Sequence, residues 1–246
     1  MKRHLKKKEI ETQKYFTEQD TVFSWWDPEN PKMKNGYSNK DRILFKKERD
    51  IILDYLKTSN AETILDVGSG RGRISLSIAK QHPKSRVIGI DLSPQMVEYS
   101  KNLAAEKKIE NVEFKIGNGL SLEFKENLFD ITICIQVLMH IPEPDLLLSE
   151  IKRVTKEYGI IIIDQINSNH SWRTKLRGKK NRILVPIKEF IAHKFLRKTP
   201  IVYRMKEKEY KWLIERNQLS IEKYLTLSIE SAKPVYFLAF CKNISA

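Results

Sequence analysis

The sequence contains only two cysteines among its 246 residues, and it has no long apolar run. Two cysteines are too few for the disulfide framework of a small secreted domain, and the apolar segment around Cys134 predicts a buried thiol. No segment approaches the roughly 20 apolar residues that a membrane-spanning helix requires. The first residues are basic, but no apolar stretch follows them as it would in a signal peptide. We therefore expect a reduced, cytoplasmic protein.

The sequence also lacks a cluster of metal ligands, and its basic residues outnumber its acidic ones. No group of His, Cys, Asp or Glu has the spacing of a metal site, so we expect no metal. Lys and Arg number 45 against 31 Asp and Glu, and the formal net charge is +14. The excess is uneven, because residues 167–206 contain twelve Lys or Arg and a single acidic residue, Glu189. This segment predicts an anionic partner, although a charged surface that contacts only water explains it equally well.

Segments with strand-like and helix-like apolar spacing alternate along the chain. The expected strands lie at 63–67, 86–91, 112–117, 129–136 and 159–166, and two late strands lie at 220–227 and 234–243. Helical spacing is present at 40–57, 72–81, 95–108, 143–156 and 206–217. Ser93 is expected to cap the helix that follows it, with Pro94 at the first helical position. This alternation predicts an α/β fold in which helices cover both faces of a parallel sheet.

A glycine-rich loop separates the first expected strand from the helix after it. Gly68, Gly70 and Gly72 alternate with Ser69 and Arg71 in the stretch ILDVGSGRGRISLSIA, residues 64–79. A phosphate-binding P-loop would need Gly-Lys-Ser/Thr at its end, but Arg and Ile follow the last glycine. A dinucleotide fingerprint would need its third glycine at position 73, which is an arginine. What remains is a glycine loop preceded by an acidic residue within the strand.

Four segments in order carry a resemblance to a known family. They are LDVGSGRG (65–72), IGIDLS (88–93), IGNG (116–119) and FDITICIQVLMHIPEP (129–144). With these motifs, residues 48–165 resemble the class I S-adenosylmethionine-dependent methyltransferases. The resemblance implies S-adenosylmethionine as cofactor and a Rossmann-like, doubly wound sheet of seven strands, mostly parallel with the last strand antiparallel. The chain departs from the family pattern at KEYGI before the fifth strand and at NQLS before the sixth.

The resemblance also implies how the chain is organised. We expect one methyltransferase domain over residues 1–246. Its parts would be an N-terminal extension or lid (1–47), a cofactor-binding core (48–166), a basic lid insertion after the fifth strand (167–206), and a C-terminal helix with strands (207–246). In this family such an extension and insertion usually cover the acceptor, and Trp25, Trp26 and Asp27 fall within the extension.

Each motif assigns residues to one part of the cofactor. The glycine loop, with Gly68, Ser69, Gly70 and Gly72, would lie against the methionine end, and Asp66 would hold its ammonium group. Asp91 would accept hydrogen bonds from the ribose hydroxyls. The adenine and the remaining methionine contacts would fall to Leu92, Met96, Asn118, Gly119, Leu120, Ile135 and Gln136.

Structural roles remain open for several of these residues. Asp91 is also suited to cap the helix at Pro94, and Asn118-Gly119 is also typical of a turn. Leu92, Met96 and Leu120 would serve equally as core residues.

The acceptor side of the site has fewer signals. His140 follows the fourth strand and is the leading candidate for a general base, although a His that only packs or bonds to the loop fits as well. His170, Tyr15 and Tyr37 are weaker candidates. Apolar and basic residues mix in RILVPIKEFIAHKFLRK (182–198), a pattern typical of peripheral membrane contact, of an amphiphilic acceptor, or of a lid helix.

These features predict an enzyme that methylates a small-molecule or lipid-linked acceptor at O, N or C. The alternative is an RNA methyltransferase that binds phosphates through the basic face. RNA is the less favoured partner, since the sequence contains no RNA-binding module and no Asn-Pro-Pro-Tyr-like motif after the fourth strand. A binding protein without catalysis is a third class, and the complete set of cofactor motifs disfavours it.

Overall fold

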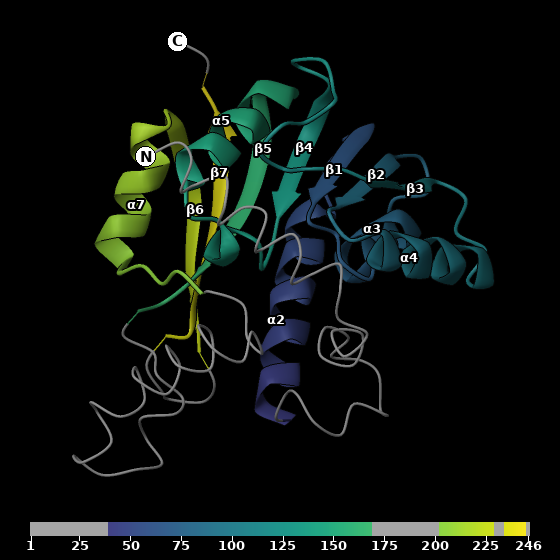
Figure 1. The fold of residues 1–246 in the computed structure, drawn as a ribbon, viewed down its shortest axis with the longest axis horizontal. Helices are drawn as coiled ribbons and strands as arrows, with labels where there is room; N and C mark the ends of the chain where they lie inside the picture. The colour runs from purple at the N-terminus through teal and green to yellow at the C-terminus, as the bar shows by residue number, and fades with distance from the viewer. Residues whose placement is uncertain (1–38, 169–201, 229–233, 245–246) are drawn as a thin grey trace.

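The computed structural model describes residues 39–168, 202–228 and 234–244, and a seven-stranded sheet forms their centre (Figure 1). The strand order is β3-β2-β1-β4-β5-β7-β6. The strands are β1 (Thr63–Val67), β2 (Arg86–Asp91), β3 (Val112–Ile116), β4 (Phe129–Cys134), β5 (Thr155–Ile166), β6 (Leu219–Leu227) and β7 (Tyr236–Asn243). β1 to β5 run parallel, and β7 is antiparallel to both of its neighbours. The predicted Rossmann-like sheet is confirmed.

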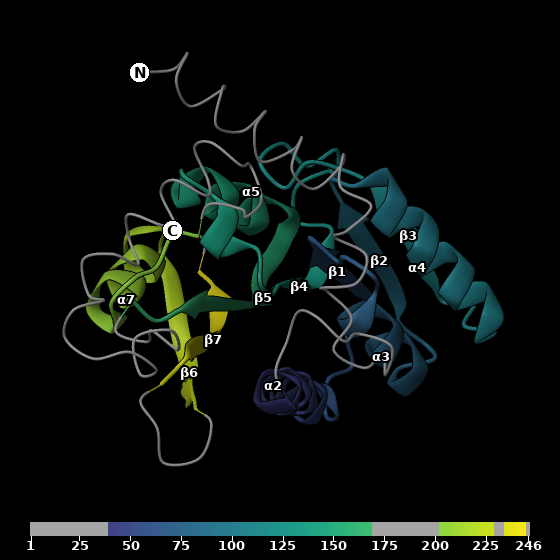
Figure 2. The same ribbon diagram turned by 60° about the horizontal axis from the view of Figure 1, so that its bottom comes forward.

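Helices cover both faces of the sheet (Figure 2). They are α2 (Asn39–Leu56), α3 (Arg73–Gln81), α4 (Pro94–Glu106), α5 (Pro144–Val154) and α7 (Glu207–Arg216), with a short 3₁₀ helix η2 (Leu138–His140). Apolar residues of α2 and α3 share one core cluster, and those of α5 and α7 share another on the opposite face. A smaller cluster joins α3, α4 and β3.

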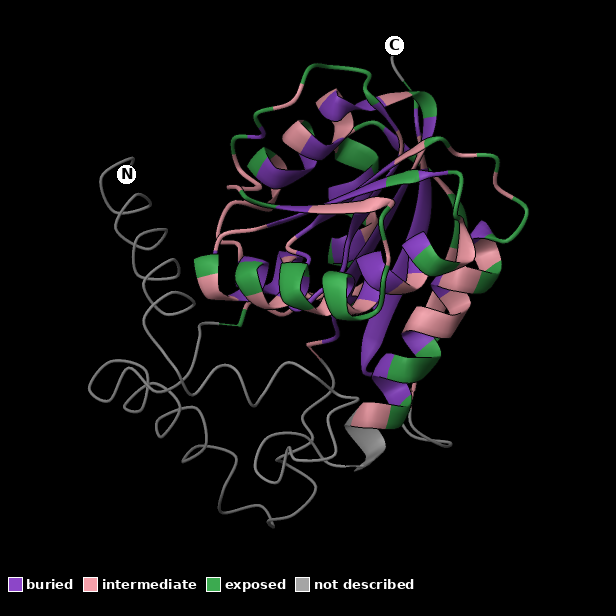
Figure 3. Cartoon of the chain, turned by 90° about the vertical axis from the view of Figure 1, so that its right-hand side faces the viewer, coloured by how far each residue is buried: buried purple, intermediate pink, exposed green. Residues whose placement is uncertain are grey.

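The central strands are buried on both sides, as Figure 3 shows by colour. In β5, Ile161 and Ile163 belong to the core cluster under α5 and α7, while Ile162 belongs to the cluster under α2 and α3. Alternate side chains of a strand point to opposite faces, so a run of isoleucines fills both cores at once. This is why the segment GIIIIDQI lacks the polar alternation of a strand with one face in water.

The helix ends follow the sequence closely, with one difference. Ser93 caps α4, since its hydroxyl accepts a hydrogen bond from the Met96 amide at 3.4 Å, and Pro94 begins the helix. The helix predicted to run to residue 156 ends at Val154, and β5 begins at Thr155 rather than at 159. The Thr155 hydroxyl donates to the Ile151 carbonyl at 2.6 Å, while its backbone pairs with Phe129 of β4. Pairing with β4 therefore ends the helix earlier than its apolar spacing suggests.

The two ends of the segment that connects β5 to α7 lie side by side. The Ser168 amide donates to the Met205 carbonyl at 2.9 Å, and the Met205 amide donates to the Ile166 carbonyl at 3.2 Å. The Tyr203 amide donates to the Met139 carbonyl of η2 at 2.7 Å. Residues 169–201, and with them most of the basic segment, lie outside the described residues, as do Tyr15, Trp25, Trp26, Asp27 and Tyr37.

Candidate active site

A pocket opens at the carboxyl edge of the parallel strands, around the ends of β1, β2 and β4. The strand order reverses between β1 and β4, and ligands of open α/β sheets bind at such a switch point. Thirteen of the fourteen predicted site residues line this pocket: Asp66, Gly68, Ser69, Gly70, Asp91, Leu92, Met96, Asn118, Gly119, Leu120, Ile135, Gln136 and His140. The fold therefore brings together four motifs that are far apart in the sequence.

Gly72 is the predicted residue that does not line the pocket. It precedes α3 as its N-cap residue and lies against Phe114 and Leu76. Its place is structural, in the turn that starts the helix.

The glycine loop presents bare backbone to the pocket. Gly68 and Gly70 have φ angles of 73° and 52°, in the left-handed region that glycine tolerates best. A Cβ atom on Gly68 would lie 2.2 Å from Val137 Cγ2, so a side chain has no room there. A Cβ atom on Gly70 would meet no atom within 4 Å, so a ligand can approach this part of the backbone closely.

Asp91 braces the glycine loop from the end of β2. One carboxylate oxygen accepts from the Gly70 amide at 2.8 Å, and the other accepts from the Ser93 amide at 2.9 Å. Burial raises the pKa of Asp91, and these backbone hydrogen bonds oppose the rise. Ser93 rather than Asp91 caps α4, so the capping interpretation of Asp91 is replaced by a bracing contact within the pocket.

Asp66 supplies a second carboxyl group, at the end of β1. The residue is 2% exposed, and the Ser75 hydroxyl donates to its carboxyl group at 2.5 Å. Burial raises the pKa of Asp66 to about 6, while Ser75 and Arg73 work in the opposite direction. A buried carboxylate of this kind is stabilised by a cation beside it.

The third motif combines a turn with a pocket wall. The Asn118 side-chain oxygen accepts from the Leu120 amide at 2.9 Å, so Asn118-Gly119 does form the turn that its composition predicts. The same residues line the pocket together with Leu92 and Met96. Leu120 also packs against the core cluster under α5, so its core role and its place in the pocket wall coexist.

His140 lies at the end of η2 and lines the pocket. Its side chain is 6% exposed, and its backbone amide donates to the Val137 carbonyl at 2.8 Å. The returning residue Tyr203 contacts the neighbouring Met139. His140 therefore lines the pocket and follows directly the residue that Tyr203 of the basic segment contacts.

Two polar residues at the site, Arg71 and Asp164, were not among the predicted site residues. Arg71, within the glycine loop, lies with its guanidinium 3.6 Å from the centre of the Tyr99 ring and lines the pocket. Behind the pocket, Asp164 at the end of β5 accepts from both the backbone and the side-chain nitrogen of Gln136, at 2.7 and 2.6 Å. The position of Arg71 between two glycines was a usable signal, whereas nothing local distinguishes Asp164.

The pocket fits the cofactor that the motifs imply. Carboxyl groups end two adjacent strands, open backbone lies between them, and apolar side chains from α4 and the third motif complete the walls. Asp66 is suited to an ammonium group, Asp91 to hydroxyl donors, and Leu92, Met96 and Leu120 to the faces of an aromatic base.

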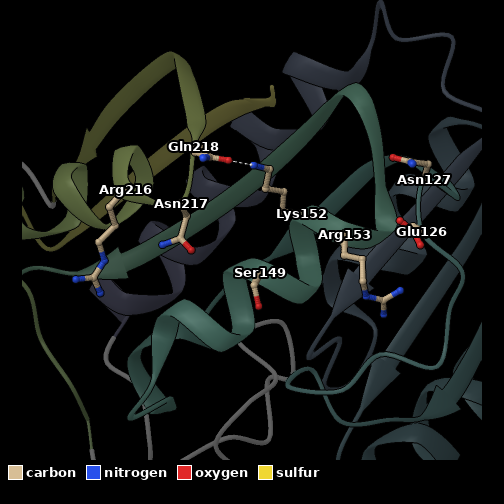
Figure 4. A pocket seen from close by; sticks show the side chains of 8 residues that line it. All are labelled: Glu126, Asn127, Ser149, Lys152, Arg153, Arg216, Asn217 and Gln218. Carbon is tan, nitrogen blue, oxygen red and sulfur yellow. Dashed lines mark hydrogen bonds between the residues drawn. The ribbon is translucent and has the colours of Figure 1, made fainter. Parts of the chain in front are cut away.

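A second, shallow pocket of about 400 Å³ lies at the opposite edge of the sheet, where α5 and α7 end (Figure 4). Its cations already have partners: Lys152 donates to Gln218 at 2.8 Å, and Arg153 pairs with Glu150 at 2.8 Å. The carboxyl ends of helices also disfavour anions. This pocket therefore lacks the features of a cofactor site.

Residues 58–218 match a family model described as a methyltransferase domain. The match covers more than half of the chain, and the chain belongs to this family. The sheet order and the ordered motifs make it a class I S-adenosylmethionine-dependent methyltransferase, and S-adenosylmethionine is the cofactor of that class. The family resemblance and the cofactor prediction are thus confirmed.

Relatives match the chain over part of their length. An uncharacterized methyltransferase, YcgJ, from Bacillus subtilis is 31% identical over 138 residues, which are 55% of this chain and 53% of the relative. A ubiquinone biosynthesis O-methyltransferase from Coxiella burnetii is 25% identical over 150 residues, 61% of this chain and 60% of the relative. The chain spans about half the length of the curated relatives it matches.

The fold is also that of solved methyltransferase structures. The magnesium protoporphyrin IX methyltransferase from Synechocystis PCC 6803, crystallised with bound SAH, superimposes with a TM-score of 0.73 at 19% identity. The superposition covers 96% of this chain and 100% of that chain. Among residues 39–168, 202–228 and 234–244, no helix is long and apolar enough to cross a membrane, and no group of three His, Cys, Asp or Glu could hold a metal ion.

Proposed function

We propose that the chain transfers the methyl group of S-adenosylmethionine to a small-molecule acceptor. The observation that carries this proposal is the arrangement of Asp66 and Asp91 on adjacent strand ends, with the open backbone of Gly70 between them. This arrangement provides one negative group for a cationic amine and one acceptor for a diol, on either side of a backbone that a ligand can touch.

The cofactor supplies an activated methyl group on a sulfonium centre, and the protein mainly orients and desolvates the reactants. Asp66 binds the ammonium group, and Asp91 binds the ribose hydroxyls while it holds the Gly70 amide in place. Leu92, Met96 and Leu120 pack against the adenine and keep water from it. The backbone at Ile135 and Gln136 lies at the methionine end.

His140 is proposed as the general base for acceptors that must lose a proton. Its support is its position, buried in the pocket wall and next to the contact between η2 and Tyr203. An imidazole has the right intrinsic pKa to accept a proton from a hydroxyl or an amine near neutral pH.

The acceptor is proposed to be amphiphilic or anionic, and to bind between His140 and the basic segment 167–206. Two observations support this: the segment leaves and returns beside η2, and it carries twelve Lys or Arg against one acidic residue. The names of two similar proteins point to ring-bearing compounds, in ubiquinone biosynthesis and in magnesium protoporphyrin IX. Residues 1–47 and 167–206 would together cover this acceptor, within one domain spanning residues 1–246.

The test is a transfer assay with methyl-labelled S-adenosylmethionine. We expect label in a quinone-ring, porphyrin or lipid-linked acceptor and none in RNA. Label in RNA alone would favour the alternative function, in which the basic segment binds phosphates. Calorimetry with S-adenosylmethionine, S-adenosylhomocysteine and NAD gives an independent check, since binding of NAD alone would contradict the cofactor assignment.

A further inference from the structure

A buried polar cluster lies directly behind the cofactor pocket. Glu48 of α2 and Asp164 of β5 are 1% and 0% exposed, yet both carry carboxyl groups. Arg73, the first residue of α3, donates to Glu48 at 3.2 Å and to the Phe45 carbonyl at 2.8 Å. The cluster therefore joins α2, the helix after the glycine loop, and the end of β5.

The charges in this cluster balance when one proton is shared. Both carboxyl groups accept from the Gln136 side-chain nitrogen, Asp164 at 2.6 Å and Glu48 at 3.4 Å, so two buried acids lie close together beside a single cation, Arg73, and burial favours a proton on one of them. Burial raises the pKa of both, and Arg73 opposes the rise at both. Only Glu48 also receives a hydrogen bond from Arg73, at 3.2 Å, so Asp164 is the carboxyl group that favours the protonated form. Cys134 and Tyr210 also face Asp164, and burial raises the pKa of each and keeps it neutral.

Asp164 clamps a residue in an unfavourable backbone conformation. Gln136 has a φ angle of 64°, in the left-handed region that residues with a side chain rarely occupy. Asp164 accepts from its backbone amide at 2.7 Å and from its side-chain amide at 2.6 Å. Gln136 also donates to Glu48 at 3.4 Å. Both carboxyl groups thus hold the same turn, and that turn lines the pocket.

We propose that Asp164, supported by Glu48, is a positioning residue for the cofactor, because it holds Gln136 in the backbone conformation that shapes the methionine end of the pocket. The proposal rests on the proposed function, since it concerns the affinity for S-adenosylmethionine and its product. It also makes α2 a support of the cofactor site, because Glu48 lies in α2 and Arg73 of α3 donates to the Phe45 carbonyl of the same helix.

Glycine at position 136 separates positioning from a purely structural role. Glycine adopts φ near 64° readily, so Gln136→Gly removes the need for the clamp, whereas Gln136→Ala keeps it. Asp164→Leu replaces a neutral, protonated group by an apolar one of similar size, and it leaves the ion pair of Glu48 and Arg73 intact. This substitution therefore removes the clamp without leaving a buried charge unpaired.

The experiment measures S-adenosylhomocysteine affinity by calorimetry on folded protein, with thermal unfolding recorded for each variant. Asp164→Leu should weaken binding at least about tenfold, which corresponds to roughly 1.4 kcal/mol. Adding Gln136→Gly to Asp164→Leu should restore the affinity to within about threefold of the Gln136→Gly single variant. Adding Gln136→Ala instead should restore nothing. Asp164→Asn, which keeps one acceptor and one donor, should bind much more tightly than Asp164→Leu.

Asp130→Leu is the matched control. Asp130 also accepts from a backbone amide, that of Thr63 at 2.9 Å, but at the opposite edge of the same sheet. It should lower the unfolding temperature and leave the affinity unchanged. If Asp164→Leu does not fold, Asp164→Val takes its place in the same comparison.

The proposal is overturned if Asp164→Leu binds S-adenosylhomocysteine as tightly as the unmodified protein does. It is also overturned if Gln136→Gly and Gln136→Ala change the affinity of the Asp164→Leu variant equally. Failure of the unmodified protein to bind S-adenosylhomocysteine would instead overturn the proposed function, so the two failures are distinguishable.

Discussion

Replacing Asp91 by asparagine should sharply weaken cofactor binding. Its two carboxylate oxygens accept from Gly70 and Ser93 at 2.8 and 2.9 Å, and in the proposed complex they also accept from the ribose hydroxyls. Asparagine keeps one acceptor oxygen and loses the charge. A hydrogen bond to a charged group contributes about 1.5–3 kcal/mol, so the affinity should fall about tenfold to a hundredfold.

Calorimetry with S-adenosylhomocysteine and its 2′-deoxy analogue tests this reasoning. The unmodified protein should lose affinity when the 2′-hydroxyl is removed, whereas Asp91→Asn should lose far less on the same change. Glu113→Gln is a suitable control, since this carboxylate on the adjacent strand β3 pairs with Arg86 at 3.0 Å and does not line the pocket. Equal losses for both proteins on removal of the hydroxyl would refute the role of Asp91.

Three further results are expected. Burial raises the pKa of Asp66 to about 6, and only its charged form attracts an ammonium group, so S-adenosylhomocysteine affinity should rise as the pH increases through about 6. Asp66→Asn should flatten that pH profile in calorimetry, and an unchanged profile would assign the titration elsewhere. His140→Ala should lower kcat by about 10²–10⁴ with little change in cofactor affinity, and the loss should shrink at high pH; an unchanged kcat would leave His140 a packing role. Neutralising five cations of the basic segment should weaken binding to anionic vesicles or to the acceptor, and added salt should reduce the difference from the unmodified protein, while cofactor affinity stays the same. The cations are Arg173, Lys175, Arg177, Lys179 and Lys180. A variant that binds like the unmodified protein would show that the positive charge serves only hydration.

The sequence predicted the sheet and most of the pocket wall because both depend on local patterns. The spacing of apolar residues indicates the strands and helices, and the adjacent residues Ser93 and Pro94 mark the start of α4. The pocket residues follow the ends of successive strands, and a parallel sheet brings those ends to one edge. The glycine motif also predicts Gly72 at the site, and the structure places it at the start of α3 with a φ angle of 77°.

The cluster behind the pocket could not be predicted in this way. Glu48 and Asp164 are 116 residues apart, and each lies in a segment whose apolar spacing suggests only a core helix or a core strand. Both reach the side chain of Gln136 because α2 packs beside the carboxyl end of β5, and such packing has no local sequence signature. The left-handed conformation of Gln136 has no glycine to signal it in the sequence, and it accompanies a contact with the distant residue Asp164.

The hydrogen bond that joins the two ends of the β5–α7 connection has a consequence for the evolution of this protein. Because Ser168 and Met205 are hydrogen-bonded at 2.9 Å, everything between them starts and finishes at a fixed pair of anchor points. Loops closed in this manner tolerate changes in length at a modest entropic cost. If the basic segment binds the acceptor as proposed, exchange of the residues between these anchor points should alter the choice of acceptor and leave the strand ends of the pocket unchanged.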